Sequence, residues 1–211
     1  MASFRTAVSG FALLALAGCN ATLDPVSPKE SLPGYLTVSS GMPVPYLFQG
    51  SAIQWNQHYA VSAAHIPMLP DVVHRCSTGC DLVFIRREAE GPVPNWRPTV
   101  VGETLEVVGL SPSLVTVRGI GVSKATKVRL DRAGDTTAYA VNDAPIVKGM
   151  SGGPVYGADD AVVGMTIGIF QPQHPRMGAR QNDRKLSVYV PYEIIQKEWR
   201  FFMEGRNRNE S

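Results

Sequence analysis

A serine set among three glycines is the feature that most constrains this chain. It lies in the stretch KGMSGGP, residues 148–154, directly before the apolar pair Val155 and Tyr156. Glycine weakens a strand and adds no side chain to a core, so this stretch suits a loop whose backbone approaches a ligand. A serine oxygen in such a loop can attack a carbonyl while backbone N–H groups receive the oxyanion. A glycine turn with an incidental serine is the alternative.

The composition favours one all-β domain. The chain has 211 residues, 44% of them hydrophobic, which is ample for one core. Its 20 glycines and 16 prolines fall between short runs rich in Val, Ile and Thr, a pattern typical of strands joined by turns. The net charge of +2, with 18% charged residues, argues against nucleic acid as a partner.

The N-terminus has the pattern of a targeting segment. An arginine precedes the apolar run Phe11–Leu16, which is too short to span a bilayer as a helix. Cleavage after the small-x-small triplet Ala15–Ala17 is one interpretation. We prefer the other, because Leu-Ala-Gly-Cys at residues 16–19 resembles the lipobox of bacterial lipoproteins. That resemblance implies a signal peptide over residues 1–18 and a lipidated Cys19, which would anchor the protein to a membrane of the bacterial cell envelope.

The three cysteines are consistent with this interpretation. Lipidation of Cys19 leaves Cys76 and Cys80 as an even pair, which could close a small disulfide loop in an oxidising compartment. Two reduced, buried cysteines are the alternative. We expect no metal there, because no second ligand pair with zinc-like spacing occurs, and no cofactor is implied.

Residues 19–34 are polar, interrupted by prolines and without periodicity. We therefore predict a lipidated cysteine followed by a tether that does not fold onto the domain. The ordered domain is expected over residues 35–205.

A predicted hairpin carries the second motif. Strands at residues 48–55 and 59–65 are separated by a short turn, and the second strand ends in Val-Ser-Ala-Ala-His. Together with the serine loop, this segment resembles the chymotrypsin-like serine proteases, whose catalytic histidine ends such a strand. The resemblance implies that His65 is the general base and Ser151 the nucleophile. It also implies that the N–H groups of Gly149 and Ser151 are the oxyanion donors.

Asp81 is the predicted third member of the triad. It opens the strand-like run at residues 82–87, which begins with four apolar residues, as the catalytic aspartate does in the family. A carboxylate that accepts the Nδ1–H of histidine fixes its tautomer. Sixteen residues separate His65 from Asp81, fewer than in most relatives, so we expect a trimmed first barrel. Asp71 is the rival for this role, and capping of a turn is the alternative role for Asp81.

The resemblance implies an all-β fold of two packed, six-stranded antiparallel Greek-key β-barrels with a C-terminal α-helix. We place barrel one at residues 35–94, barrel two at 99–190, the helix at 191–204 and a polar tail at 206–211. Expected strands of barrel two lie at residues 102–109, 114–122, 127–130, 136–141, 161–170 and 186–190. The nearest branch is the bacterial high-temperature-requirement-type protease domain, here expected without its peptide-binding domain.

Substrate contacts also follow from the resemblance. In the family, the strand expected at residues 161–170 pairs with an extended peptide by β-augmentation, so Thr166, Ile167 and Gly168 are implied substrate-binding residues. Pro145 falls near the primary specificity position. Because no carboxylate stands there, cleavage after Lys or Arg is not expected. A basic loop, residues 171–185, follows the strand and could gate the pocket or attract acidic substrates.

Met150 departs from the digestive branch of the family, which has an aspartate directly before the serine. Methionine cannot pair with a newly cut N-terminal ammonium, so zymogen activation of that kind is not expected.

The sequence thus predicts a membrane-anchored serine endopeptidase that cleaves cell-envelope or extracellular proteins through an acyl-enzyme. The alternative is a catalytically silent member that binds an envelope protein in the same cleft. The pattern Gly-x-Ser-x-Gly also fits lipolytic α/β-hydrolases, but that fold places the acid and the histidine after the serine. The chain order His, Asp, Ser therefore argues against it.

Overall fold

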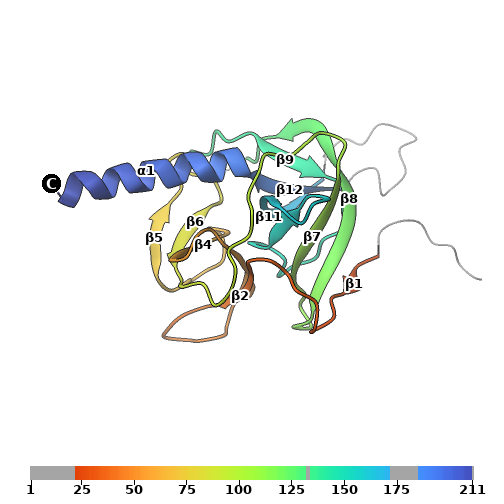
Figure 1. Cartoon of the computed structure of the whole chain (residues 1–211), viewed down its shortest axis with the longest axis horizontal. Helices are drawn as coiled ribbons and strands as arrows, with labels where there is room; N and C mark the ends of the chain where they lie inside the picture. The colour runs from red at the N-terminus through yellow and green to blue at the C-terminus, as the bar shows by residue number, and fades with distance from the viewer. Residues whose placement is uncertain (1–21, 132–133, 172–184, 211) are drawn as a thin grey trace, which may run out of the picture.

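The computed structural model describes residues 22–131, 134–171 and 185–210, with side chains up to residue 208. Two antiparallel sheets and one C-terminal helix make up the described secondary structure (Figure 1). The predicted all-β fold with a C-terminal helix is confirmed. Cys19 and all but the ends of the basic loop at residues 171–185 lie outside the described residues.

Barrel one is a five-stranded sheet in the order β2-β3-β4-β6-β5. Its strands are β2 (Tyr35–Ser39), β3 (Gln49–Gln54), β4 (Tyr59–Ser62), β5 (Val72–Arg75) and β6 (Val83–Arg86). This is one strand fewer than in an untrimmed barrel, since the chain between β4 and β6 is long enough for only one short strand. The expected trimming of barrel one therefore removes a whole strand.

Barrel two is a closed ring of six strands with a seventh strand added outside. The ring closes because β8 pairs with both β7 and β9, and the sheet order is β1-β8-β7-β10-β11-β12-β9. Its strands are β1 (Asp24–Pro25), β7 (Thr104–Leu110), β8 (Thr116–Val128), β9 (Tyr139–Asn142), β10 (Pro154–Tyr156), β11 (Val162–Phe170) and β12 (Leu186–Pro191).

Strand β8 joins two strands that the sequence analysis keeps apart. The predicted strands at residues 114–122 and 127–130 are one strand that runs from Thr116 to Val128. Its pairing with β9 shifts register between Ser123 and Lys127, so the small and polar residues there form an irregularity rather than a turn.

The prediction of a free tether is wrong for residues 22–34. Strand β1 pairs with β8, and the N–H of Val26 donates to the carbonyl of Thr116 at 2.9 Å. Val26 is buried and packs in the main core, so the open edge of β8 and an apolar side chain hold this segment to barrel two.

Helix α1 (Tyr192–Glu210) packs across barrel one, as Figure 1 shows. It begins within one residue of the predicted start but continues past residue 204, through most of the predicted polar tail. Trp199 lies against Phe84 of β6, with ring centroids 5.3 Å apart, and against Tyr59 of β4 at 5.1 Å. Within the described residues, no helix has the length and apolar character that crossing a bilayer requires.

Candidate active site

His65 and Asp81 come together at the end of barrel one that faces barrel two. His65 Nδ1 lies 2.6 Å from Asp81 Oδ2, and the backbone N–H of His65 donates to Asp81 Oδ1 at 2.9 Å. The carboxylate therefore holds both the ring and the backbone of the histidine. The Asp81 side chain is fully buried, whereas that of His65 is 39% exposed. Nδ1 carries the proton in this pair, because a buried carboxylate only accepts, and Nε2 is left as a base that faces outward.

Small residues bring the histidine into this position. Strand β4 ends at Ser62, Ala63 is buried, and the N–H of Ile66 donates to the carbonyl of Ala63 at 3.2 Å, which closes a tight turn around His65. The rival carboxylate, Asp71, is exposed at the turn before β5 with φ of 55°. The carboxylate paired with His65 is thus Asp81.

The serine loop lies where the two barrels meet. The N–H of Ser51 on β3 donates to the carbonyl of Ser151 at 2.9 Å, which ties the loop to barrel one. The N–H of Gly152 donates to the carbonyl of Thr166 at 2.7 Å, and the N–H of Thr166 donates to the carbonyl of Gly153 at 2.9 Å. These bonds attach the same loop to β11, so both barrels fix the position of Ser151.

The glycines allow this close approach. Gly149 and Gly152 have φ of 92° and 86°, which L-residues rarely adopt. A Cβ at Gly152 would lie 1.9 Å from the carbonyl oxygen of Ser51. A Cβ at Gly149 would lie 2.6 Å from the carbonyl oxygen of Leu110. The glycine pattern is therefore a packing requirement of the loop.

The backbone of the loop has donors available for an oxyanion. Among the described residues, no group accepts a hydrogen bond from the N–H of Gly149 or of Ser151. Stabilisation of an oxyanion requires N–H groups that are close to the attacking oxygen and have no other acceptor.

The loops that carry Ser151 and His65 lie close together, but the structure shows no hydrogen bond between the side chains of these two described residues. Ser151 Oγ donates to the carbonyl of Ile167 at 3.5 Å. The loops of the two residues converge at Gly50, where a Cβ would lie 2.5 Å from Ile66 Cδ1 and 3.3 Å from the carbonyl oxygen of Ser151. Catalytic hydrogen bonds are often long before substrate binds, so this geometry is compatible with a resting site.

The end of β11 offers one open edge beside Ser151. Strand β10 pairs with β11 only as far as Met165, whereas β12 pairs with β11 up to Phe170. Among the described strands, only β12 pairs with the stretch that holds Ile167 and Gly168. A cavity of about 260 Å³ adjoins this stretch, and it is lined by Leu130, Asp131, Ile167, Gly168, Ile169 and Val188.

The other predicted substrate residues differ in exposure. Thr166 is buried, with its backbone paired to the serine loop, so its side chain faces inward. Pro145 is half-buried and lies against β8, where a Cβ at Gly119 would be 2.1 Å from the carbonyl oxygen of Pro145. Met150 is fully buried in the core of barrel two, and its Sδ lies 3.3 Å from the N–H of Val147.

Cys76 and Cys80 form a disulfide, with an S–S distance of 2.11 Å, in the loop that leads directly into Asp81. In the described part of the chain, no three His, Cys, Asp or Glu side chains are grouped as ligands of a metal ion.

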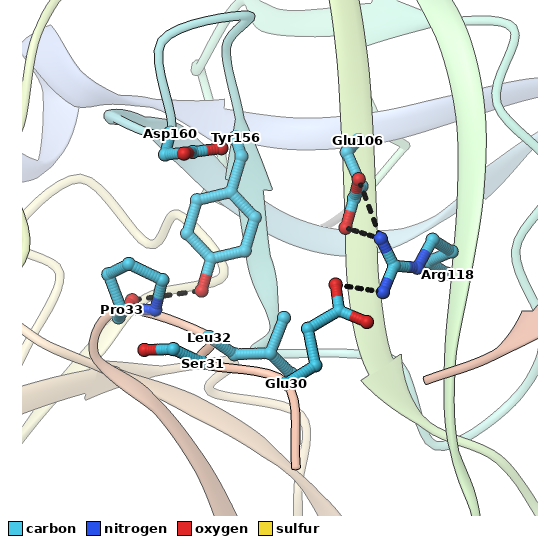
Figure 2. Close-up of a pocket in the computed structure, with 8 residues that line it drawn as sticks. All are labelled: Glu30, Ser31, Leu32, Pro33, Glu106, Arg118, Tyr156 and Asp160. Carbon is cyan, nitrogen blue, oxygen red and sulfur yellow. Dashed lines mark hydrogen bonds and ion pairs between the residues drawn. The ribbon is translucent and has the colours of Figure 1, made fainter. Parts of the chain in front are cut away.

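A second cavity, of about 310 Å³, lies outside this site and is drawn in Figure 2. Arg118 lies between Glu30 and Glu106 there, and the Tyr156 hydroxyl donates to the carbonyl of Pro33 at 2.8 Å. Burial raises the pKa of Glu106 above its usual value, even though Arg118 opposes the shift. These contacts fasten the N-terminal segment to barrel two.

Three residues that support the site were missed by the sequence analysis. Ser51 Oγ accepts from the N–H of Leu110 and donates to the carbonyl of Gly149, at 3.0 and 3.3 Å. Glu198 of α1 accepts from the N–H of Ser77 in the disulfide loop, and Tyr139 Oη accepts from the N–H of Asp81. The Gly-Ser pair inside an apolar strand was the one sequence signal, and it pointed only to Ser51.

Comparison with solved structures identifies the fold. The HtrA-type protease AlgW with a bound tripeptide superimposes with a TM-score of 0.63 at 16% identity, over 79% of this chain and 59% of that chain. A serine endoprotease from Yersinia pestis gives a TM-score of 0.63 at 16% identity, over 82% and 64%. The fold of this chain is that of the HtrA-type serine proteases.

A third chymotrypsin-like structure agrees. The M. tuberculosis protein Rv3671c, as a serine-to-alanine mutant in its inactive form, gives a TM-score of 0.60 at 14% identity, over 82% of this chain and 87% of that one. This chain thus spans about three fifths of the length of AlgW, and the match covers the protease fold. No family model matches the sequence, and no curated protein matches it.

Proposed function

We propose that this protein is a serine endopeptidase whose triad is His65, Asp81 and Ser151. The observation that carries the proposal is the pair formed by a buried carboxylate and a partly exposed imidazole, 2.6 Å apart, beside a glycine-rich serine loop. The protease fold and the unpaired N–H groups of Gly149 and Ser151 support the same chemistry.

The reaction follows from this arrangement. A bound peptide places its carbonyl carbon against Ser151 Oγ, and the serine oxygen turns from Ile167 toward His65 Nε2. His65 takes the hydroxyl proton as the oxygen attacks, and Asp81 stabilises the imidazolium. The tetrahedral oxyanion accepts hydrogen bonds from the N–H groups of Gly149 and Ser151. His65 then protonates the leaving amine, and water activated by the same base hydrolyses the acyl-enzyme.

Protein or peptide substrates fit the open edge of β11. An extended peptide would add to this edge at Ile167 and Gly168, and its side chains would reach the adjoining cavity of about 260 Å³. Pro145, near the primary specificity position, carries no charge, so small or apolar side chains before the scissile bond are favoured there over Lys and Arg. Of the described residues that line the adjoining cavity, only Asp131 is acidic.

The proposed site of action is the bacterial cell envelope, with the protein held by a lipid on Cys19. Residues 22–34 pack on barrel two, so only residues 20 and 21 would separate the anchor from the folded domain. Substitution Cys19→Ala is expected to move the full-length protein from the membrane fraction to the soluble fraction and to abolish incorporation of a labelled fatty acid. Unchanged membrane association would contradict the anchor.

A second candidate function is a silent binding module. The structure describes both Ser151 and His65 and shows no hydrogen bond between them, which favours a module without catalytic activity. Such a module would use the same cleft and the same edge of β11 to hold an envelope protein without cutting it.

Labelling with a fluorophosphonate probe separates the two candidates. The wild-type protein is expected to react much faster than Ser151→Ala, and His65→Ala and Asp81→Asn should each lower the rate by about 10³-fold or more. Equal labelling of wild type and Ser151→Ala, with both proteins folded, would exclude the peptidase and favour the binding module.

A further inference from the structure

A tyrosine from barrel two reaches the aspartate of barrel one. Tyr139 begins β9, and its Oη accepts a hydrogen bond from the backbone N–H of Asp81 at 3.0 Å. The same hydroxyl donates to Asp135 Oδ2 at 2.5 Å. Tyr139 and Asp81 are 0% and 1% exposed, so this contact is shielded from water. No residue of the triad is adjacent to Tyr139 in the sequence.

The direction of these hydrogen bonds follows from the single proton of the Tyr139 hydroxyl. A phenol has one proton, and its donation to Asp135 leaves an oxygen lone pair for the N–H of Asp81. The N–H of Thr137 donates to Asp135 Oδ1 at 2.9 Å and so holds the acceptor in place. Burial and, next, the hydrogen bond to Asp135 raise the pKa of Tyr139 far above its usual value. The hydroxyl therefore stays protonated at any pH where a peptidase of this type would work.

The contact acts on the orientation of His65. Both carboxylate oxygens of Asp81 hold His65, one through the ring and one through the backbone N–H. The N–H of Asp81 belongs to the peptide that follows Cys80, in a short turn where the N–H of Leu82 donates to the carbonyl of Cys80 at 2.8 Å. Rotation of that peptide would swing the Asp81 side chain and move the imidazole relative to Ser151.

We propose that Tyr139 is a positioning residue for the reaction, which sets the orientation of the Asp81–His65 pair from the second barrel. This inference rests on the proposed function, because it assigns to Tyr139 a role in the same triad. It links the strand that leads to the serine loop, β9, with the aspartate of barrel one. The relative placement of the barrels and the geometry of the triad are then coupled through one hydroxyl group.

The direct test is Tyr139→Phe in the full chain. This change removes the hydroxyl and keeps the ring, so the hydrogen bond from the N–H of Asp81 to Oη is lost while the packing stays the same. The rate of fluorophosphonate labelling is expected to fall by about tenfold, because the peptide that carries Asp81 is held less firmly and the Asp81–His65 pair moves from its orientation. Tyr156→Phe is the matched control, because Tyr156 is also buried and hydrogen-bonded to backbone but lies outside the site. Its labelling rate should match that of wild type.

A spectroscopic measurement distinguishes positioning from general stability. The proton that His65 Nδ1 donates to Asp81 is expected to give a far-downfield ¹H resonance, because the two atoms lie only 2.6 Å apart. A general loss of stability would leave this resonance in place in the folded protein. In Tyr139→Phe this resonance is expected to shift upfield or broaden, whereas in Tyr156→Phe it should stay unchanged. An unchanged resonance together with an unchanged labelling rate would overturn the inference.

A milder variant covers the case in which Tyr139→Phe does not fold. Asp135→Asn, at a half-buried position, weakens the orientation of the hydroxyl without emptying the core. We expect a smaller change of the same resonance, and no change would again overturn the inference. The resonance does not depend on turnover, so it also tests the inference if wild type and Ser151→Ala label equally and the proposed function fails.

Discussion

Gly153 shows how single residues set the position of Ser151. It follows the serine by two residues and packs against β7. A Cβ there would lie 2.0 Å from the carbonyl oxygen of Val108 and 2.9 Å from that of Met150. Both neighbours are backbone atoms, which cannot move aside without shifting the strand or the loop. The serine loop therefore depends on the absence of a side chain as much as on the serine itself.

The first prediction concerns this glycine. Gly153→Ala is expected to lower the free energy of unfolding by about 3 kcal/mol or more, because overpacking against backbone cannot be relieved by a rotamer change. Labelling by the fluorophosphonate probe should also fall. Urea denaturation measures the first effect.

Gly91→Ala is the control, since a Cβ at Gly91 has nothing within 4 Å, and its stability should stay within about 0.5 kcal/mol of wild type. Equal stability of the two variants would show that the loop tolerates a side chain.

At the scale of elements, the disulfide loop before Asp81 is held by helix α1. Glu198 is 1% exposed and accepts hydrogen bonds from the N–H and the hydroxyl of Ser77, both at 2.8 Å. Its other contact is His74 Nε2, at 3.2 Å. The helix thus does more than cover barrel one, because it fixes the loop that leads into Asp81.

The second prediction tests this contact. Glu198→Ala is expected to lower the free energy of unfolding by about 2 kcal/mol, because it removes a buried carboxylate that accepts two hydrogen bonds from Ser77. Glu204→Ala, on the exposed part of the same helix, should change it by about 0.5 kcal/mol or less. Thermal and urea unfolding of both variants provide the comparison, and similar losses in the two would argue against a special role for Glu198.

The third prediction concerns the disulfide itself. It closes a loop with a sequence separation of 4, for which the loss of chain entropy in the unfolded state corresponds to about 2 kcal/mol. The double variant Cys76→Ser with Cys80→Ser should lose about this much stability, and reductant should lower the stability of wild type but not of the variant. A wild-type unfolding curve that reductant leaves unchanged would contradict the prediction.

The local sequence pattern predicted most helices and strands, but it carried no information about contacts between segments that are far apart in the chain. The sequence pattern predicted strands at the positions of β3, β4, β7 and β11, and the helical spacing before residue 204 predicted α1. The arrangement in two barrels was implied by the resemblance to the chymotrypsin-like proteases. Strand β1 has two residues, too few for any periodicity, so the pairing of residues 24 and 25 with β8 could not be predicted. Tyr139 and Asp81 are 58 residues apart and meet only because the barrels pack together. Supporting contacts of this kind carry no local signal.

At the scale of the whole molecule, Arg97 joins the linker between the barrels to barrel two. Its guanidinium donates to Glu103 Oε2 and to Asp159 Oδ1, both at 2.7 Å. Arg97 lowers the pKa of Asp159 from 3.8 to about 2. Burial by itself would raise the pKa of Glu103, but the hydrogen bonds from Arg97 and from the N–H of Val100 outweigh it and lower the pKa.

The fourth prediction is a pH dependence of stability. Both carboxyls have folded-state pKa values below their unfolded values of 4.5 and 3.8, so the native state binds fewer protons than the unfolded state. Their contribution is present above pH 4.5 and is lost as the pH falls toward 2. The melting temperature should fall over this window, and less steeply in Arg97→Gln than in wild type.

The control for this prediction is Arg200→Gln, at an exposed position of α1, which should keep the wild-type slope. Melting temperatures measured by circular dichroism from pH 6 to pH 2 make the comparison. Parallel curves for wild type and Arg97→Gln would contradict the role given to the network.

The central claim is that Ser151 is a nucleophile activated by His65 and Asp81. Tandem mass spectrometry of the fluorophosphonate-treated full-length protein tests it most directly, because it locates the new bond on a residue. The account predicts one phosphonate adduct, on Ser151 Oγ, and no adduct in Ser151→Ala. An adduct on another residue, or none in the folded wild-type protein, would contradict it.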